Sequence, residues 1–467
     1  MRLKRELSLF DLTNIVIGSI VGADIYVAST LTAGLIGPFS IIVWLIAGLF
    51  ATVIALVFAY CSYYVPKVGG PFAFVSEAFD HFYGFLTGWS MWIAEVLALS
   101  VFSLAFVNYL QYFIPLGFFQ QIAIKGLFLF ALTFINVIGV KVAGKFNDIL
   151  TIVKLSPLLL LIIAGMLFFA FNPQVIAKNY TPLAPFGVGK IGTAIVLIFW
   201  AYAGFELGTL PASEVKNPKV TIPKAIIIGM VIVTVFYLST NFVVYGLINW
   251  RDLANTSIPL VLVGSTLLGA IGAAIMAIGA IISVSGSDES GILGTARLSY
   301  AMSLEGMFPK IFSKIHSKYD TPYMSLIIQG AIAFTFAIFS GISRLISFSV
   351  FNLAFSFLLT CLALIVLTKN NVKKLHGQNI LPLIGIAICL YLIYSTSMFD
   401  KIVGLILILF GIPLYVFFSP KVEISNLKKM FVSEEAILSR RLERKEKFLA
   451  NFIRLLHRIY RKLTKMD

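Results

Sequence analysis

The chain has 467 residues, of which 59% are hydrophobic and 12% charged, and it carries a formal net charge of +15. A soluble protein of this length needs a much larger charged surface, so the composition excludes a soluble globular protein. The positive charge lies in the tail and in loops between apolar segments, which indicates membrane topology and no nucleic-acid partner.

Long apolar segments recur along the whole chain. Each is close to the roughly 20 residues that cross about 30 Å of hydrocarbon as a helix. The sequence therefore predicts an all-α polytopic membrane protein with twelve transmembrane helices, at about 11–35, 39–64, 84–114, 121–140, 148–171, 191–211, 224–248, 260–303, 323–340, 343–367, 380–397 and 401–419.

Basic residues in the loops predict the orientation. With both termini in the cytoplasm, fifteen Lys and Arg residues before the tail lie on the cytoplasmic side and six on the other. This asymmetry follows the positive-inside rule and indicates a multi-pass protein of the cell membrane. In the basic tail, residues 439–465 have the helical spacing and basic face that suit anionic lipid or a partner. A solvated tail that only reinforces the topology is an equal alternative.

Sequence patterns for metal, ATP or hydrolytic chemistry are absent. Cys61, Cys361 and Cys389 lie in apolar segments without metal-ligand spacing, and all four histidines fall in predicted loops or the tail. The chain has no P-loop, HExxH or GxSxG pattern. We expect no metal, no cofactor and no enzymatic activity, intramembrane catalysis included.

Six ionisable residues nevertheless fall within or at the edges of the apolar segments. A charge at bilayer depth is costly unless it is neutralised, paired or functional, so each marks a candidate site. Together they indicate a polar pathway across the membrane, and they are Lys154, Asp24, Glu95, Glu206, Asp288 and Glu289.

Two spans carry small residues mid-span beside an acid, IGSIVGADIYV (17–27) and FWAYAGFELGTLP (199–211). Glycine weakens a helix, and freed backbone groups at lipid depth need partners from protein or water, so we expect both spans to be broken. Because the breaks lie five spans apart, they predict two five-helix copies in inverted orientation with a site at the midplane. Gly18 and Gly22 also fit the GxxxG pattern of helix packing, which is the alternative.

Four motifs, in order along the chain, resemble segments of one transporter family: GADIYVAS (22–29), GFLTGWSMWIAEVLAL (84–99), FWAYAGFE (199–206) with SEVKNPKVTIPKAI (213–226), and GTARLSYAMSLEGMFPKIF (294–312) with KYDTPYMSL (318–326). They are similar to the first, third, sixth and eighth spans of the amino acid–polyamine–organocation permeases. The likeness covers about residues 8 to 330. It implies a five-plus-five inverted repeat and secondary transport of amino acids, polyamines or related amines.

We expect the substrate between the two breaks. Free N–H groups near Gly22, Ala23 and Asp24 at the start of the second half of this span would attract an amino acid's carboxylate, and we also place Ile25 in the substrate site. Carbonyls of the sixth-span break would bind the ammonium group, and aromatic side chains would wall the site or stack on a cation, although such aromatics more often only pack. The sixth-span residues are Trp200, Ala201, Tyr202, Ala203, Gly204 and Phe205.

Asp24 departs from the resemblance, because relatives usually carry a small residue there. A charged Asp24 would repel a substrate carboxylate in a dry site, so it is either protonated during binding or binds an amine directly. An acid held by backbone N–H groups at a helix start is the alternative. Asp288 and Glu289 lie about 100° apart on a helix, so at most one faces the substrate. The excess of acids over Lys154 favours amine-bearing, cationic cargo.

Lys154 lies where some proton-coupled members of that family carry a lysine in place of a coupling ion. The resemblance implies that its ammonium reaches the carbonyls of broken span 1 and the hydroxyl of Ser283 or Ser285. A buried lysine gives up its proton more readily than an exposed one, so we expect proton coupling, with Glu206 as a further candidate. The alternative is a structural Lys–Asp pair between spans 5 and 8.

The sequence therefore predicts an alternating-access permease for amino acids or related amines, with protons as coupling ion. An antiporter that exchanges an amino acid for an amine is the nearest rival, and a nutrient sensor that signals through the tail is a third interpretation. The expected parts are a cytoplasmic N-terminus (1–10), two repeats (11–171 and 191–367), two final helices (380–419) and the basic tail (420–467).

Overall fold

The computed structural model describes residues 7–67, 69–139, 143–209, 215–369 and 377–418. The predicted tail, 420–467, lies outside the described residues, as do residues 1–6. The described chain is helical, with turns, loops and an isolated parallel bridge between Leu7 and Val215.

The elements in chain order are α1 (Leu9–Ile20), α2 (Ala23–Ile36), η1 (Gly37–Phe39), α3 (Ser40–Tyr64), α4 (Pro71–Ala78), α5 (His81–Leu110), α6 (Phe118–Ile138), α7 (Ala143–Phe171), α8 (Pro173–Asn179), α9 (Ile191–Ala201), η2 (Phe205–Thr209), α10 (Pro218–Leu247), α11 (Trp250–Ala254), α12 (Pro259–Leu304), η3 (Lys310–Ser313), α13 (Tyr323–Phe339), α14 (Ile342–Lys369), α15 (Leu381–Ser395) and α16 (Met398–Phe418).

Eight helical stretches of the described chain are long and apolar enough to cross a membrane. The first of them, Leu9–Tyr64, contains α1, α2 and α3, so one stretch holds more than one helix. The shorter apolar helices α9, α13 and α15 add to the set. The prediction of an all-α, multi-pass membrane protein is confirmed.

The first span is broken at its glycine cluster, as predicted. Helix α1 ends at Ile20, and α2 begins at Ala23. Between them Val21 is extended, and Gly22 has φ −141° and ψ −136°. Two short helices therefore replace one continuous span.

The second predicted break is also present. Helix α9 ends at Ala201, and the chain turns through Tyr202, Ala203 and Gly204 into the 3-10 helix η2. Gly204 has φ +115°, a backbone conformation that other residues rarely adopt. Gly204 thus allows the chain to leave the helical path directly after α9.

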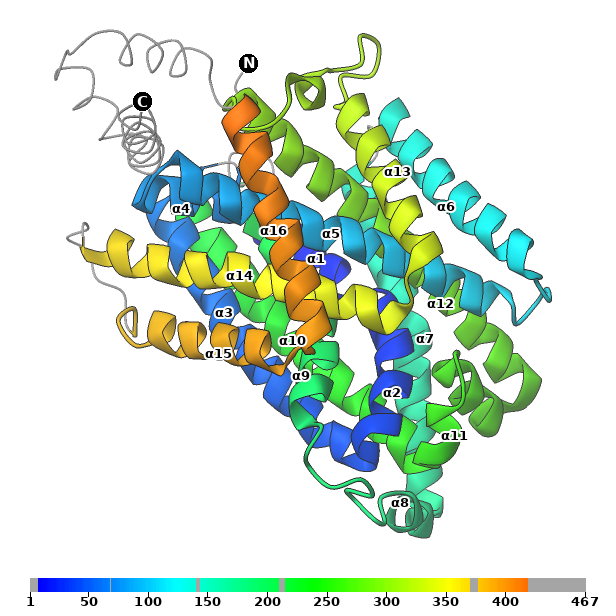
Figure 1. Cartoon of the computed structure of the whole chain (residues 1–467). Helices are drawn as coiled ribbons and strands as arrows, with labels where there is room; N and C mark the ends of the chain where they lie inside the picture. The colour runs from blue at the N-terminus through cyan, green and yellow to red at the C-terminus, as the bar shows by residue number, and fades with distance from the viewer. Residues whose placement is uncertain (1–6, 68, 140–142, 210–214, 370–376, 419–467) are drawn as a thin grey trace, which may run out of the picture.

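Helix α5 forms the centre of the bundle. Helices α4, α12, α13 and α14 pack against it. Of its most apolar stretch 83% is buried, against 22% for α6 and for α16, which places those two at the periphery. Figure 1 shows α13 beside α6 at one edge and α15 beside α14 at another. Exposed side chains such as Phe119, Phe130 and Phe410 on the outer helices suit contact with lipid.

Helix α12 bends sharply at Gly269, which has φ +63° and ψ −149°. The bend brings Gly264 and Gly272 into backbone contact. A Cβ added to Gly272 would lie 2.2 Å from the Gly264 carbonyl oxygen, so no side chain fits there.

We expect Gly272→Ala to destabilise the protein by roughly 1–3 kcal/mol, as overpacking of a tight contact does. Gly341→Ala is the matched control, because a Cβ at that position meets nothing within 4 Å. Thermal unfolding of both purified variants in detergent measures the difference. Equal melting temperatures of the two variants would show that α12 accommodates the added Cβ at residue 272 without loss of stability.

Candidate functional site

A narrow internal cavity lies against both helix breaks. Its volume is about 30 Å³, room for about two water molecules, so side chains must move before a larger molecule can enter. The lining comes from five regions: Ser19, Ile20 and Asp24 around the first break, Glu95, Ala98 and Phe102 on α5, Trp200, Ala203, Gly204 and Leu207 around the second break, Ser287 and Gly291 on α12, and Ser349 and Leu353 on α14.

Four of the twelve expected substrate residues line this cavity: Asp24, Trp200, Ala203 and Gly204. The others do not, and they are Gly22, Ala23, Ile25, Ala201, Tyr202, Phe205, Asp288 and Glu289. Sequence reasoning grouped residues by proximity along the chain, but a helix turns neighbouring side chains in different directions.

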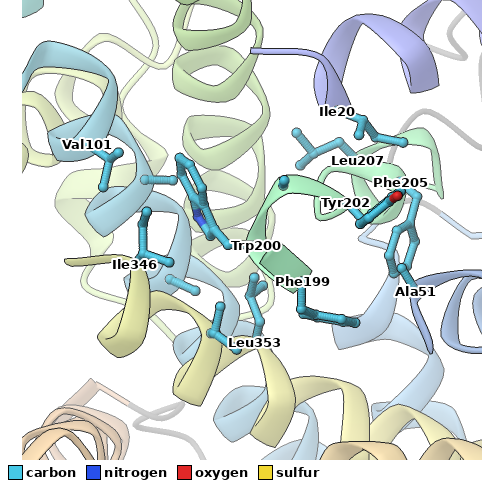
Figure 2. Close-up of a cluster of buried hydrophobic side chains, with 14 of the residues drawn as sticks. Ile20, Ala51, Val101, Phe199, Trp200, Tyr202, Phe205, Leu207, Ile346 and Leu353 are labelled. Atoms are coloured by element: carbon cyan, nitrogen blue, oxygen red, sulfur yellow. The ribbon is translucent and has the colours of Figure 1, made fainter. Parts of the chain in front are cut away.

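The sixth-span aromatics illustrate this divergence. Figure 2 shows Trp200 directed toward Val101 and Ile346, whereas Phe205 extends from the opposite side of the break toward Ala51. The Tyr202 hydroxyl donates to the Trp44 carbonyl at 3.0 Å, which ties the break to α3. Only Trp200 of these aromatics is therefore available to a molecule in the cavity.

The two breaks touch each other through their backbones. A Cβ added to Gly204 would lie 2.8 Å from the Ser19 carbonyl oxygen. The absence of a side chain and the positive φ of Gly204 together permit this approach. The end of α1 and the turn after α9 thus form one continuous wall of the cavity.

Asp24 is held by two donors at the start of α2. The Gly22 N–H donates to one carboxylate oxygen at 2.7 Å, and the Tyr237 hydroxyl of α10 donates to the other. The expectation of a free N–H at Gly22 for the substrate carboxylate is therefore wrong, because Asp24 already accepts that N–H. This geometry is the alternative weighed for Asp24, an acid that caps a helix start.

Lys154 connects three helices. It is 2% exposed, and its Nζ donates to the Gly18 carbonyl of α1 at 2.5 Å and to Ser287 Oγ of α12 at 3.0 Å. Ser287 Oγ in turn donates to the Val21 carbonyl at 2.7 Å. The ammonium and the hydroxyl together satisfy carbonyls that the first break releases.

The hydroxyl bonded to Lys154 is not one of the two expected. Ser285 donates to the Ile281 carbonyl at 2.7 Å, and Ser283 Oγ is buried without a partner among the described atoms. Ser287 lies one helical turn beyond Ser283 on the same face, which brings it level with the break. The register of α12 against α1 therefore decides which of the three serines reaches Lys154.

Glu206 is fully buried on η2 beside a second acid. One of its oxygens accepts the Gly204 N–H at 2.9 Å, and the other has no partner among the described atoms. The carboxyl group of Glu95, on α5, is its electrostatic neighbour and lines the cavity. The two carboxyl groups thus join the second break to the central helix.

Asp288 and Glu289 point in different directions, as adjacent helical residues do. Asp288 is completely buried, and neither of its oxygens has a partner among the described atoms. Glu289 is half-buried and interacts electrostatically with Lys154 and Arg297. Neither acid lines the cavity.

Helical spacing is the signal that would have found the missed lining residues. Ser287 and Gly291 lie four residues apart on α12, as do Ser349 and Leu353 on α14. Glu95, Ala98 and Phe102 likewise follow one face of α5. Within the described chain, no three His, Cys, Asp or Glu side chains are placed to hold a metal ion.

We expect Tyr237→Phe to destabilise the protein by about 1–3 kcal/mol, because it leaves a buried Asp24 oxygen without its donor. Tyr26→Phe is the matched control, since Tyr26 is equally buried but its hydroxyl has no partner among the described atoms. Melting temperatures of the two variants in detergent test this difference. If both variants melt like the wild type, the Asp24–Tyr237 contact contributes nothing to stability.

Comparison with known proteins covers nearly the whole chain. Residues 7–438 match the family described as amino acid permease. The chain is 28% identical over 442 residues to the branched-chain amino acid permease BcaP of Bacillus subtilis (strain 168), covering 90% of this chain and 94% of that protein.

Two further relatives come from the same organism. The methylthioribose transporter is 28% identical over 450 residues, covering 91% of this chain and 95% of the relative. The serine/threonine exchanger SteT is 25% identical over 433 residues, covering 88% and 96%.

Proposed function

The chain belongs to the amino acid permease family of the amino acid–polyamine–organocation superfamily, and we propose that it carries positively charged amino acids or related amines by proton-coupled alternating access. As a member of this family it is a multi-pass membrane transporter of amino acids and not an enzyme. The cargo, the coupling ion and the topology are the parts that we propose.

We infer a topology of twelve membrane passes in two inverted repeats of five. The first repeat would comprise α1 with α2, α3, α5, α6 and α7, and the second α9 with η2, α10, α12, α13 and α14. Helices α15 and α16 would follow. Breaks at the first pass of each repeat support this assignment, because a repeat with an odd number of passes leaves the copy that follows it inverted. The distribution of basic residues supports cytoplasmic termini.

The contacts of Lys154 carry the proposal of proton coupling. Its ammonium bonds the Gly18 carbonyl and Ser287, so it holds the first break against α12. Loss of the proton would remove a charge-assisted bond from this contact and allow the two elements to separate. Protonation would then be linked to the position of α1, which is what coupling requires.

The charges in the cavity support a cationic cargo. Among the described residues that line it, Asp24 and Glu95 are acidic and none is basic. A cation would be attracted to such a lining, and the aromatic face of Trp200 offers it a further favourable contact.

We expect an inwardly directed proton gradient to stimulate uptake into proteoliposomes, and Lys154→Ala to lose most of that stimulation. The Lys154→Ala variant removes the group that links the proton to the first break. Lys125→Ala is the matched control: Lys125 is also buried and donates to a backbone carbonyl, that of Ala337 at 3.2 Å, but this bond joins α6 to α13 and involves neither helix break. A Lys154→Ala variant that responds to the gradient like the wild type makes Lys154 structural and removes the coupling claim.

Exchange is the second candidate mechanism, favoured by the relative named as a serine/threonine exchanger. An exchanger needs cargo inside the vesicle, whereas a symporter does not. Uptake that appears only after the vesicles are loaded with an amino acid or its amine would therefore replace symport with antiport. Binding without any flux would instead favour the sensor.

A further inference from the structure

The Glu95–Glu206 carboxyl pair is a part of the cavity that coupling through Lys154 does not use. Glu95 is 9% exposed and lines the cavity from α5, and Glu206 is fully buried beside it on η2. The Gly204 N–H occupies one oxygen of Glu206, while the other oxygen has no partner among the described atoms. The carboxyl groups of Glu95 and Glu206 are within hydrogen-bonding reach of each other, so unless they share a proton the pair has acceptor capacity that no donor of the described chain fills.

Two buried carboxyl groups side by side are unfavourable unless a proton or a cation lies with them. Like charges in a dry site repel strongly, and an unfilled buried acceptor loses its hydration without compensation. Asp24 differs from this pair, because Gly22 and Tyr237 both donate to it. Of the two acids that line the cavity, Glu95 is thus the one whose neighbour, Glu206, has a carboxylate oxygen without a donor.

The walls next to Glu95 suit a side chain with an apolar stem and a charged end. Phe102 and Trp200 both line the cavity, with ring centroids 5.9 Å apart. Ser349, also in the lining, donates to the Ala94 carbonyl at 2.9 Å and so fixes α14 against α5 one residue before Glu95. Aromatic rings cover the methylene stem of a lysine or arginine well, while the charged end reaches a carboxylate.

We propose that Glu95, together with Glu206, binds the cationic end of the cargo's side chain, so that the cargo is an amino acid with an ammonium or guanidinium side chain. This inference rests on the proposed transport function and assigns its specificity to α5 and η2. Asp24 then keeps the structural role of capping α2. The amino acid's own ammonium and carboxylate groups would lie nearer the two breaks.

Pairs of cargo molecules that differ only in side-chain charge test the proposal. Uptake of arginine is compared with citrulline, and of lysine with norleucine, in proteoliposomes of the full chain. For the wild type we expect arginine and lysine to be preferred by about 10- to 100-fold, the range of a charge-assisted contact. Glu95→Gln should remove most of that preference while uptake of the neutral molecules persists.

Asp400→Asn is the matched control, since Asp400 is similarly buried (8% exposed, on α16) but does not line the cavity. An equal loss of charged and neutral uptake in Glu95→Gln would overturn the proposal, because Glu95 would then serve the α-ammonium group or the fold. An unchanged preference would overturn it too, while leaving cationic transport in place.

If Glu95→Gln does not fold, competition by citrulline against arginine in the wild type still decides: equal competition refutes the proposal. Wild-type flux of neutral amino acids alone refutes the cationic cargo but not transport, whereas no flux of any amino acid refutes both.

Discussion

Backbone groups released by the two helix breaks must find partners inside the protein, because lipid offers none. The first break releases the carbonyls of Gly18 and Val21, and Lys154 and Ser287 bond to them. At the second break the Gly204 N–H donates to Glu206, and Gly204 packs closely against the Ser19 carbonyl. The polar and charged side chains at the two breaks therefore stabilise irregular backbone, and several of them also form the candidate site.

The two breaks share one local arrangement. At the first, the Gly22 N–H donates to Asp24, and at the second the Gly204 N–H donates to Glu206, at 2.7 and 2.9 Å. In both cases the acid follows the glycine by two residues. What distinguishes them is the second carboxylate oxygen, which accepts from Tyr237 in Asp24, whereas the carboxyl group of Glu206 has a second acid, Glu95, as its neighbour and no donor on that oxygen among the described atoms. The same local arrangement thus gives a carboxylate with donors on both oxygens at the first break and a carboxylate with a donor on only one oxygen at the second.

Local features of the sequence predicted the membrane helices and both breaks, because apolar length and clustered glycines act within a few residues. Contacts between helices were harder to predict. The choice of Ser287 over Ser283 and Ser285 depends on how α12 is placed against α1, and the cavity-facing side of α5 depends on its rotation. Tyr237 gave no signal, since its neighbours on α10 are those of an ordinary apolar helix. Lys154 was located as a charged residue within an apolar span, the resemblance supplied its expected role, and its contact with Gly18 follows from tertiary packing.

The bridge between Leu7 and Val215 restricts which parts of the molecule can move separately. The Lys216 N–H donates to the Leu7 carbonyl at 3.0 Å, directly ahead of α1 and α10, and the two helices pack along each other. They are joined both at one end and along their lengths, so we expect them to move together. Helix α2 lies beyond the break, and a displacement of α1 and α10 relative to α2 would therefore have to change the backbone at Val21 and Gly22.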